Sequence, residues 1–252
     1  MNIKHPFLFL FILLAFGCKQ EKLSLIKIEG KQIPIDSSLQ ANPDIETYIK
    51  PYREHITKDV DSVLAYSVGT YSKTDGEFNT AIGNFMADVV YEQANPVFKS
   101  RTGKNIDMVL LNHGGIRSII SKGNITTRTA FELMPFENNI VVVALKGTQI
   151  NELIDYLKTA KRAHPISKLK LVLDQEFNAV EATVKDNRVD TLKTYHVATS
   201  DFLYEGGDNM TFFKPNDSVY NVNYKIRNAL IDYFKKIDTI SPVIDDRFIQ
   251  LK

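Results

Sequence analysis

The sequence predicts an α+β protein, close to α/β in character, in which a single domain packs helices against a mixed β-sheet. Apolar runs rich in Val and Ile, at residues 106–111 and 140–145, are typical of central strands covered on both faces. Segments with apolar residues at helical spacing alternate with these runs along the chain. The 252 residues are 44% hydrophobic and 24% charged, which suits one well-formed core better than two full-sized domains.

Four helices are expected in chain order. The first begins at Asn42, a capping residue that precedes Pro43 at the first helical position, and Pro51 should kink or restart it. The second helix covers residues 80–98. Thr148 is expected to cap a third helix that runs to about residue 162, and the last long helix covers residues 219–236. Further strands are expected at residues 169–173 and 195–199, at 248–251 on a sheet edge, and, as a short strand, at 23–28.

The first 17 residues are typical of a lipoprotein signal peptide. Lys4 and His5 precede an apolar run at residues 7–16, which is too short to span a bilayer, and Cys18 follows directly after Gly17. The segment A-F-G-C resembles a lipobox, with Phe16 where a smaller residue is usual. Cys18, the only cysteine, would carry the lipid, and the alternative is an ordinary signal peptide with an unrelated thiol. We therefore expect an exported protein, lipid-anchored on the periplasmic side or the cell surface, with a tether at residues 18–41 and the domain at 42–252.

Net charge excludes one class of partner. The chain has 31 basic and 30 acidic residues, and removing the signal peptide takes away Lys4 alone, which leaves the two kinds equal. A neutral protein gives no electrostatic reason to expect binding to nucleic acid.

Two Gly-Gly pairs follow predicted strands and suggest a binding site. Gly114 and Gly115 lie in N-H-G-G-I-R, residues 112–117, and Gly206 and Gly207 lie in D-F-L-Y-E-G-G-D, residues 201–208. Glycines at strand ends allow a ligand to approach the main chain closely, although each pair alone is more often a structural turn.

The side chains around these glycines suit a nucleoside. Arg117 has a planar fork for phosphate, carboxylate or hydroxyl oxygens. Phe136, on the turn M-P-F-E-N-N, and Phe202 could stack on a planar base, and Asp208 could accept hydrogen bonds from neighbouring sugar hydroxyls.

Four blocks together resemble the C-terminal domain of the 5'-nucleotidase family over roughly residues 60–220. They are N-H-G-G-I-R, the G-N-I-T of residues 123–126, M-P-F-E-N-N-I-V-V-V-A-L-K-G-T-Q-I and Y-H-V-A-T-S-D-F-L-Y-E-G-G-D. The resemblance implies that Asn112 and Arg117 face the substrate near its ribose and phosphate, that Phe136 and Phe202 sandwich the base, and that Asp208 binds the ribose hydroxyls. It also implies that Gly115 lies against the substrate, while Gly114, Gly206 and Gly207 shape the two loops.

The chain departs from the family in three ways. The stretch at residues 75–80 lacks an arginine that the family usually has there, and His113 stands where another glycine is common. The family's metallophosphoesterase domain, with its D-x-H, G-D-x-x-D and G-N-H-D/E metal signatures, has no counterpart in this sequence. Without two metal ions to clamp the reacting oxygens, hydrolysis is not expected from this chain alone.

Three hypotheses follow from the resemblance and the missing signatures. The chain is the nucleotide-recognition half of an enzyme of nucleotide catabolism, completed by a separate metallophosphoesterase chain that binds the divalent metals. Alternatively, it is a solitary nucleoside-binding lipoprotein, or an interaction or structural protein that has lost binding. In each case we expect no cofactor and no metal ligands in this chain.

Overall fold

The computed structural model describes residues 24–251. The chain divides into two compact units between Ile49 and Lys50. The predicted signal peptide and Cys18 lie outside the described residues. Within the described part of the chain, no helix combines the length and apolar character needed to cross a membrane.

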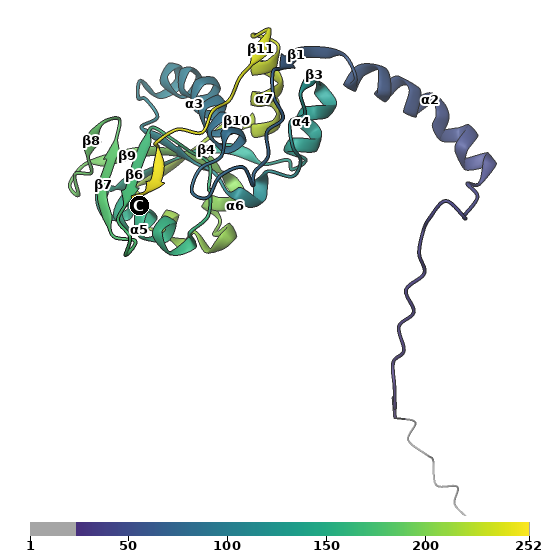
Figure 1. Ribbon diagram of the computed structural model, residues 1–252, viewed down its shortest axis with the longest axis horizontal. Helices are drawn as coiled ribbons and strands as arrows, with labels where there is room; N and C mark the ends of the chain where they lie inside the picture. The colour runs from purple at the N-terminus through teal and green to yellow at the C-terminus, as the bar shows by residue number, and fades with distance from the viewer. Residues whose placement is uncertain (1–23, 252) are drawn as a thin grey trace, which may run out of the picture. The chain divides into compact units, whose positions relative to one another are not determined.

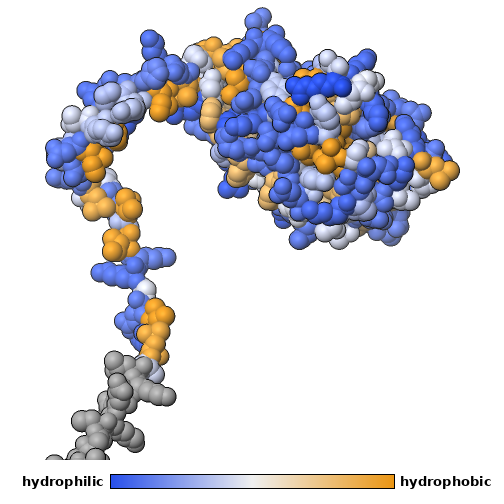
Figure 2. All heavy atoms as spheres, turned by 180° about the vertical axis from the view of Figure 1, so that it is seen from behind, coloured by the Kyte–Doolittle hydropathy of each residue, from blue (hydrophilic) through white to orange (hydrophobic). Residues whose placement is uncertain are grey.

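The first unit is extended chain followed by the start of helix α2 (Pro43–Val60). Residues 24–42 form no helix or strand, so the short strand expected at 23–28 is wrong over 24–28, where no neighbouring strand is paired with it. Apolar side chains such as Ile26 and Ile35 are exposed along this unit (Figure 2). The expected helix start is confirmed: Asn42 Oδ1 accepts a hydrogen bond from the main-chain N–H of Asp44 at 2.9 Å, and the helix continues through Pro51.

The second unit is built around a five-stranded mixed sheet (Figure 1). Its strands, in spatial order, are β10 (Ser218–Lys225), β4 (Asn139–Lys146), β9 (Thr194–Ser200), β2 (Met108–Leu110) and β5 (Ile166–Ser167). β2 and β9 are parallel and the other neighbours are antiparallel. The strands predicted at residues 106–111, 140–145 and 195–199 are therefore confirmed as the three inner strands.

Both faces of this sheet are covered, as the continuous apolar runs predicted. Along β4, Val142 packs into one hydrophobic core with helices α3 (Ala81–Thr102), α4 (Thr127–Leu133) and α7 (Ile226–Phe234). Its neighbours Val141 and Val143 point into a second core with α5 (Gly147–Ala160), and Figure 1 shows α3 and α5 on opposite sides of the sheet. Successive residues of a strand face opposite sides, so a strand apolar at every position must be buried on both.

Two smaller sheets complete the unit, so the single sheet of the sequence-based prediction is in fact three. The three-stranded sheet has the order β11 (Thr239–Ile240), β1 (Val63–Ser67), β3 (Gly123–Thr126). The four-stranded sheet has the order β12 (Phe248–Gln250), β6 (Leu169–Leu173), β7 (Ala179–Val184), β8 (Asn187–Arg188). The mixed α and β class is confirmed, as are the strand at 169–173 and the edge position of the strand at 248–251.

Two of the predicted helices need correction. The long helix expected at residues 219–236 is wrong in its first half: residues 218–225 form β10, and α7 begins at Ile226. Tyr220, Val222 and Tyr224 alternate with exposed residues and pack on the core, a period of two that belongs to a strand. Helix α5 is capped at Lys146 rather than Thr148, and Gln149 Oε1 accepts a hydrogen bond from the main-chain N–H of Lys146 at 3.0 Å.

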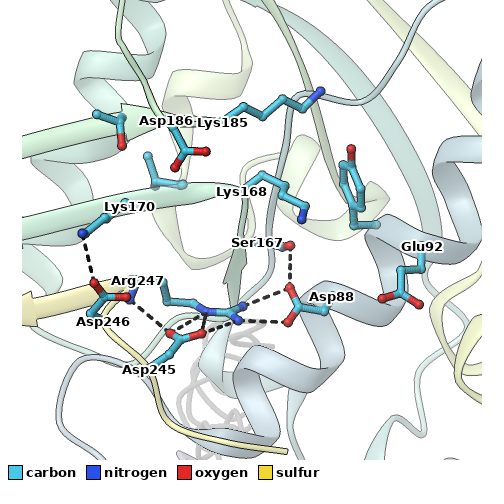
Figure 3. Close-up of a pocket in the computed structure, with 13 residues that line it drawn as sticks. Asp88, Glu92, Ser167, Lys168, Lys170, Lys185, Asp186, Asp245, Asp246 and Arg247 are labelled. Carbon is cyan, nitrogen blue, oxygen red and sulfur yellow. Dashed lines mark hydrogen bonds and ion pairs between the residues drawn. The ribbon is translucent and has the colours of Figure 1, made fainter.

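The C-terminal segment is fastened to the second unit by a charged network around Arg247 (Figure 3). The guanidinium donates to Asp88 of α3 at 2.9 Å, to Asp245 at 2.7 Å and to the main-chain oxygen of Ile166 at 2.8 Å. These bonds tie the C-terminal segment to helix α3 and to strand β5, directly before β12 pairs with β6.

Candidate functional site

The five-stranded sheet gathers three loops at one edge. In the antiparallel pair of β4 and β9, Ile140 lies opposite Ser200, so the start of β4 meets the end of β9. In the parallel pair of β2 and β9, Val109 lies opposite Ala198, so both strands end at that same edge. The loop of Phe136 precedes β4, the loop of Asn112 follows β2, and helix α6 (Asp201–Tyr204) follows β9. Every predicted substrate-binding residue lies in one of these loops, in α6 or directly after it.

The two Gly-Gly loops are joined by a direct hydrogen bond. Asn112 Nδ2 donates to Asp208 Oδ2 at 2.8 Å, across 96 residues of sequence. Gly115 stands against this pair, because a Cβ built at its position would lie 2.8 Å from Asn112 Oδ1. Asp208 itself has a left-handed φ of 51°, and its main-chain oxygen accepts a hydrogen bond from the Tyr156 hydroxyl at 3.0 Å. The carboxylate is thus held at the meeting point of the loops.

The second Gly-Gly pair is shaped by the ring of Phe202. A Cβ at Gly207 would lie 2.3 Å from an edge atom of this ring, so only glycine lets the loop pass so close. Gly206 has a φ of 104°, in the left-handed region that favours glycine. Phe202 nevertheless keeps 47% of its surface exposed, which leaves the ring accessible to a ligand.

Phe136 is held by its main chain rather than by burial. The ring is 42% exposed, and the Arg117 guanidinium lies 5.9 Å from its centroid. Arg227, a buried residue of α7, donates to the main-chain oxygens of Pro135 at 3.1 Å and Phe136 at 3.4 Å, and also pairs with Glu137. The guanidinium of Arg227 therefore fixes the turn that presents the Phe136 ring.

Glu137, next to Phe136, stays ionised, because hydrogen bonds from Arg227 and then Lys225 lower the pKa of its exposed carboxyl to about 2. The loop of Phe136 is also tied to helix α6. Asp201 Oδ2 accepts hydrogen bonds from the main-chain N–H and the side-chain Nδ2 of Asn139, at 3.0 and 3.2 Å. Since Asp201 precedes Phe202, the two phenylalanines belong to one connected frame.

A cavity of about 440 Å³ opens beside Asp208. It is lined by Gly114, Tyr156, Arg162, His164, Asp208 and Asn209, with Thr159 and Ala160. Burial lowers the pKa of His164 to about 4, although the Asp208 charge acts in the opposite direction, so this ring is neutral at pH 7. The main-chain N–H of His113 donates to His164 Nδ1 at 3.4 Å, which links the first Gly-Gly loop to the cavity wall.

A second cavity of about 440 Å³ lies around Arg247, between α3, β6 and the C-terminal segment (Figure 3). Its lining includes many charges, but Asp88, Asp245 and Arg247 satisfy one another, and Lys170 pairs with Asp246 at 3.0 Å. We therefore place the candidate site at the edge of the five-stranded sheet. Within residues 24–251, no three His, Cys, Asp or Glu side chains are grouped so that they could bind a metal ion.

Sequence patterns missed three residues that line the cavity beside this site and a fourth that supports the Phe136 turn. Tyr156, Arg162 and His164 lie on or just after α5 and reach the cavity because η3 (Thr211–Phe213) packs against that helix and the Tyr156 hydroxyl bonds to the main chain of Asp208. Arg227 falls in the segment whose first part was wrongly expected to be helical. None of the four has a motif, and only the fold brings them to the loops of Asn112, Phe136 and Asp208.

Comparison with known proteins identifies the domain type. The family model described as "5'-nucleotidase, C-terminal domain" matches residues 59–215. An apyrase of Tabanus yao is 28% identical over 249 residues, covering 89% of this chain and 44% of that protein. The 5'-nucleotidase of Bos taurus is 24% identical, covering 90% of this chain and 44% of that protein. The chain thus spans less than half the length of these relatives.

Solved structures show the same fold. The 5'-nucleotidase precursor from Thermus thermophilus matches with a TM-score of 0.66 at 24% identity, covering 82% of this chain and 42% of that one. The NAD nucleotidase of Haemophilus influenzae matches with a TM-score of 0.63 at 16% identity, covering 84% and 42%. The family model covers more than half of the chain, and the fold agrees with it. The chain therefore belongs to the 5'-nucleotidase family, in which it corresponds to the C-terminal domain.

Proposed function

We propose that the second unit recognises nucleosides and nucleotides. The main support is the arrangement of Phe136, Phe202 and the Asn112–Asp208 pair on three connected loops at one sheet edge. Both rings are nearly half exposed, as a site for stacking on a base requires. Stacking of a base on an aromatic side chain contributes ~1–3 kcal/mol.

The polar groups complete the recognition of a nucleoside phosphate. Asp208 accepts from Asn112 through one oxygen only, so the carboxylate keeps capacity to accept hydrogen bonds from ribose hydroxyls. Arg117 is exposed, and the one hydrogen-bonding contact of its side chain within residues 24–251, a 3.5 Å approach to the Gly114 oxygen, is too long to occupy the guanidinium. Its planar fork is available to phosphate oxygens. The names of the matched relatives, an apyrase and 5'-nucleotidases, agree with this ligand class.

We further propose that this chain supplies recognition while a separate metallophosphoesterase chain supplies the divalent metals and cleaves the phosphate ester, in nucleotide catabolism. The supporting observation is that the D-x-H, G-D-x-x-D and G-N-H-D/E metal signatures do not occur in these 252 residues, while the residues of the proposed nucleoside site do. A lipid on Cys18 would anchor the exported protein to a membrane. The partner chain would then have to be exported to the same membrane surface. A solitary nucleoside-binding lipoprotein is the second candidate, because the pocket residues need no partner to bind a nucleoside. An interaction protein without ligand binding is the third.

Calorimetric titration of the purified full-length protein with adenosine tests recognition. Phe136→Ala and Phe202→Ala should each weaken binding about tenfold or more, as expected from the loss of one stacking contact. Tyr66→Ala is the matched control, because Tyr66 is an aromatic residue of similar exposure, 41%, in another sheet. Absence of adenosine binding, or binding unchanged by both phenylalanine substitutions, would exclude the stacking site.

Hydrolysis of 5'-AMP, with manganese or zinc, tests the division of labour. We expect no turnover from this chain alone and turnover, with an altered KM, when it is added to the partner metallophosphoesterase. Turnover by the chain alone would contradict the assignment of the metal centre to a partner. Adenosine binding without any effect on the partner would favour the solitary binding protein.

A further inference from the structure

The cavity beside Asp208 extends the proposed nucleoside site and is not needed for the base. Under the proposed function, the Asp208 carboxylate binds the 2' and 3' hydroxyls of the ribose. The cavity begins at that carboxylate and continues to Tyr156, Arg162 and His164 at the end of α5. Its volume of about 440 Å³ lies within the range of small-molecule sites, ~300–1,000 Å³. A ligand that fills it must therefore continue beyond the 2' or 3' oxygen.

Arg162 gives this cavity an unsatisfied positive charge. Its side chain is exposed, and no hydrogen bond or ion pair joins that side chain to another residue in the range 24–251. Its charge nevertheless acts on His113, Tyr156 and His164, so the guanidinium lies close to the cavity wall. An unpaired guanidinium at a cavity is suited to an anion with planar or tetrahedral oxygens.

His164 adds a neutral ring to the same wall. Its Nδ1 accepts a hydrogen bond from the main-chain N–H of His113 at 3.4 Å. Burial is the largest effect on this ring and lowers its pKa to about 4, although a hydrogen bond with the main chain of Leu111 raises that pKa, so the ring is uncharged at pH 7. Arg162 is therefore the only cation among the described residues that line this cavity.

We propose that this cavity is a subsite for a phosphate group on the 2' or 3' oxygen of a bound nucleotide, with the Arg162 guanidinium as its donor. The proposal rests on the proposed nucleoside recognition, and it extends the ligand class to nucleotides with such a second phosphate. Asp208 would retain the remaining hydroxyl, while Asn112 donates to one of its oxygens. The phosphate on the 5' oxygen would lie toward Arg117, so the two anionic groups use different arginines.

Calorimetry of the purified full-length protein at low salt tests this subsite. Adenosine 3'-monophosphate and 2'-monophosphate are compared with adenosine, and at least one of them should bind about tenfold or more tightly. Arg162→Gln should abolish that gain while the Kd for adenosine changes less than about twofold. Lys161→Gln is the matched control, because it removes the same charge from the neighbouring residue, whose ammonium lies over the Phe177 ring at 3.3 Å and not on the cavity. It should leave the gain intact.

Each outcome separates the subsite from the nucleoside site. If adenosine binds but neither phosphate improves binding, or if Arg162→Gln leaves the gain unchanged, the subsite is refuted and the proposed function stands. If adenosine does not bind while inorganic phosphate binds and loses affinity with Arg162→Gln, the cavity is an anion site but not part of a nucleotide site, and the nucleoside proposal fails. If none of these probes binds, both proposals are refuted.

Discussion

Arg227→Met should both destabilise the protein and weaken nucleoside binding, although Arg227 lies behind the site. The residue is 5% exposed, and its guanidinium donates to the main-chain oxygens of Pro135 and Phe136. Hydrogen bonds to a charged donor contribute ~1.5–3 kcal/mol each, and the 3.4 Å bond is at the weak end. Their loss, together with two carbonyls left without this donor, should lower the free energy of unfolding by about 2–4 kcal/mol.

Denaturant unfolding followed by circular dichroism measures the first effect, and adenosine titration at a temperature where both proteins are folded measures the second. We expect adenosine affinity to fall about tenfold, because the turn that presents Phe136 loses its support. Arg128→Met is the matched control: Arg128 also pairs with a carboxylate, Asp61, but its side chain is 46% exposed, so the loss should be below ~1 kcal/mol. An Arg227→Met protein with wild-type midpoint and wild-type adenosine affinity would refute the reasoning.

Three further predictions concern other parts of the molecule. Gly207→Ala should weaken adenosine binding about tenfold in calorimetry, because the new Cβ must displace the Phe202 ring; an unchanged Kd would show that the ring position is unimportant. The folded-state pKa of His164 is below that of an unfolded histidine, so its contribution to stability is complete above pH 6.5 and is lost as the pH falls toward 4. Denaturant unfolding between about pH 7.5 and 4.5 should therefore show a smaller decline in His164→Gln than in the wild type, and equal declines would contradict this assignment. Cys18→Ala should release the protein from the membrane fraction, and continued membrane association would count against the lipid anchor.

Local signals in the sequence predicted the inner strands and the binding loops. The runs at residues 106–111 and 140–145 are apolar at every position except Asp107, and that pattern depends only on burial of both faces of a strand. Glycines and aromatic residues beside such strands indicated the loops of Asn112, Phe136 and Phe202. The structure brings all three loops to one sheet edge, as two of the strand registers require.

Weak or mixed periodicity explains the errors at the ends of elements. Residues 218–225 contain apolar residues that fit a helix as well as a strand, and pairing with β4 decides between them. The cap of α5 is Lys146 rather than the expected Thr148, because the helix begins at Gly147, directly against the main chain of Asp190. A Cβ at Gly147 would lie 2.0 Å from the Asp190 oxygen, so glycine is needed there. That contact comes from a loop far along the chain and has no signal in the sequence around Thr148.

The sequence by itself determined the family, the class of fold and the loops that contain Phe136, Phe202 and Asp208, because those properties depend on short motifs and on local burial patterns. Tertiary structure alone decided that Asn112 bonds to Asp208, that Arg227 supports the turn of Phe136, and that Arg162 and His164 border the cavity beside Asp208. These contacts join residues far apart in the chain. They arise from strand register and helix packing, which no single stretch of sequence encodes.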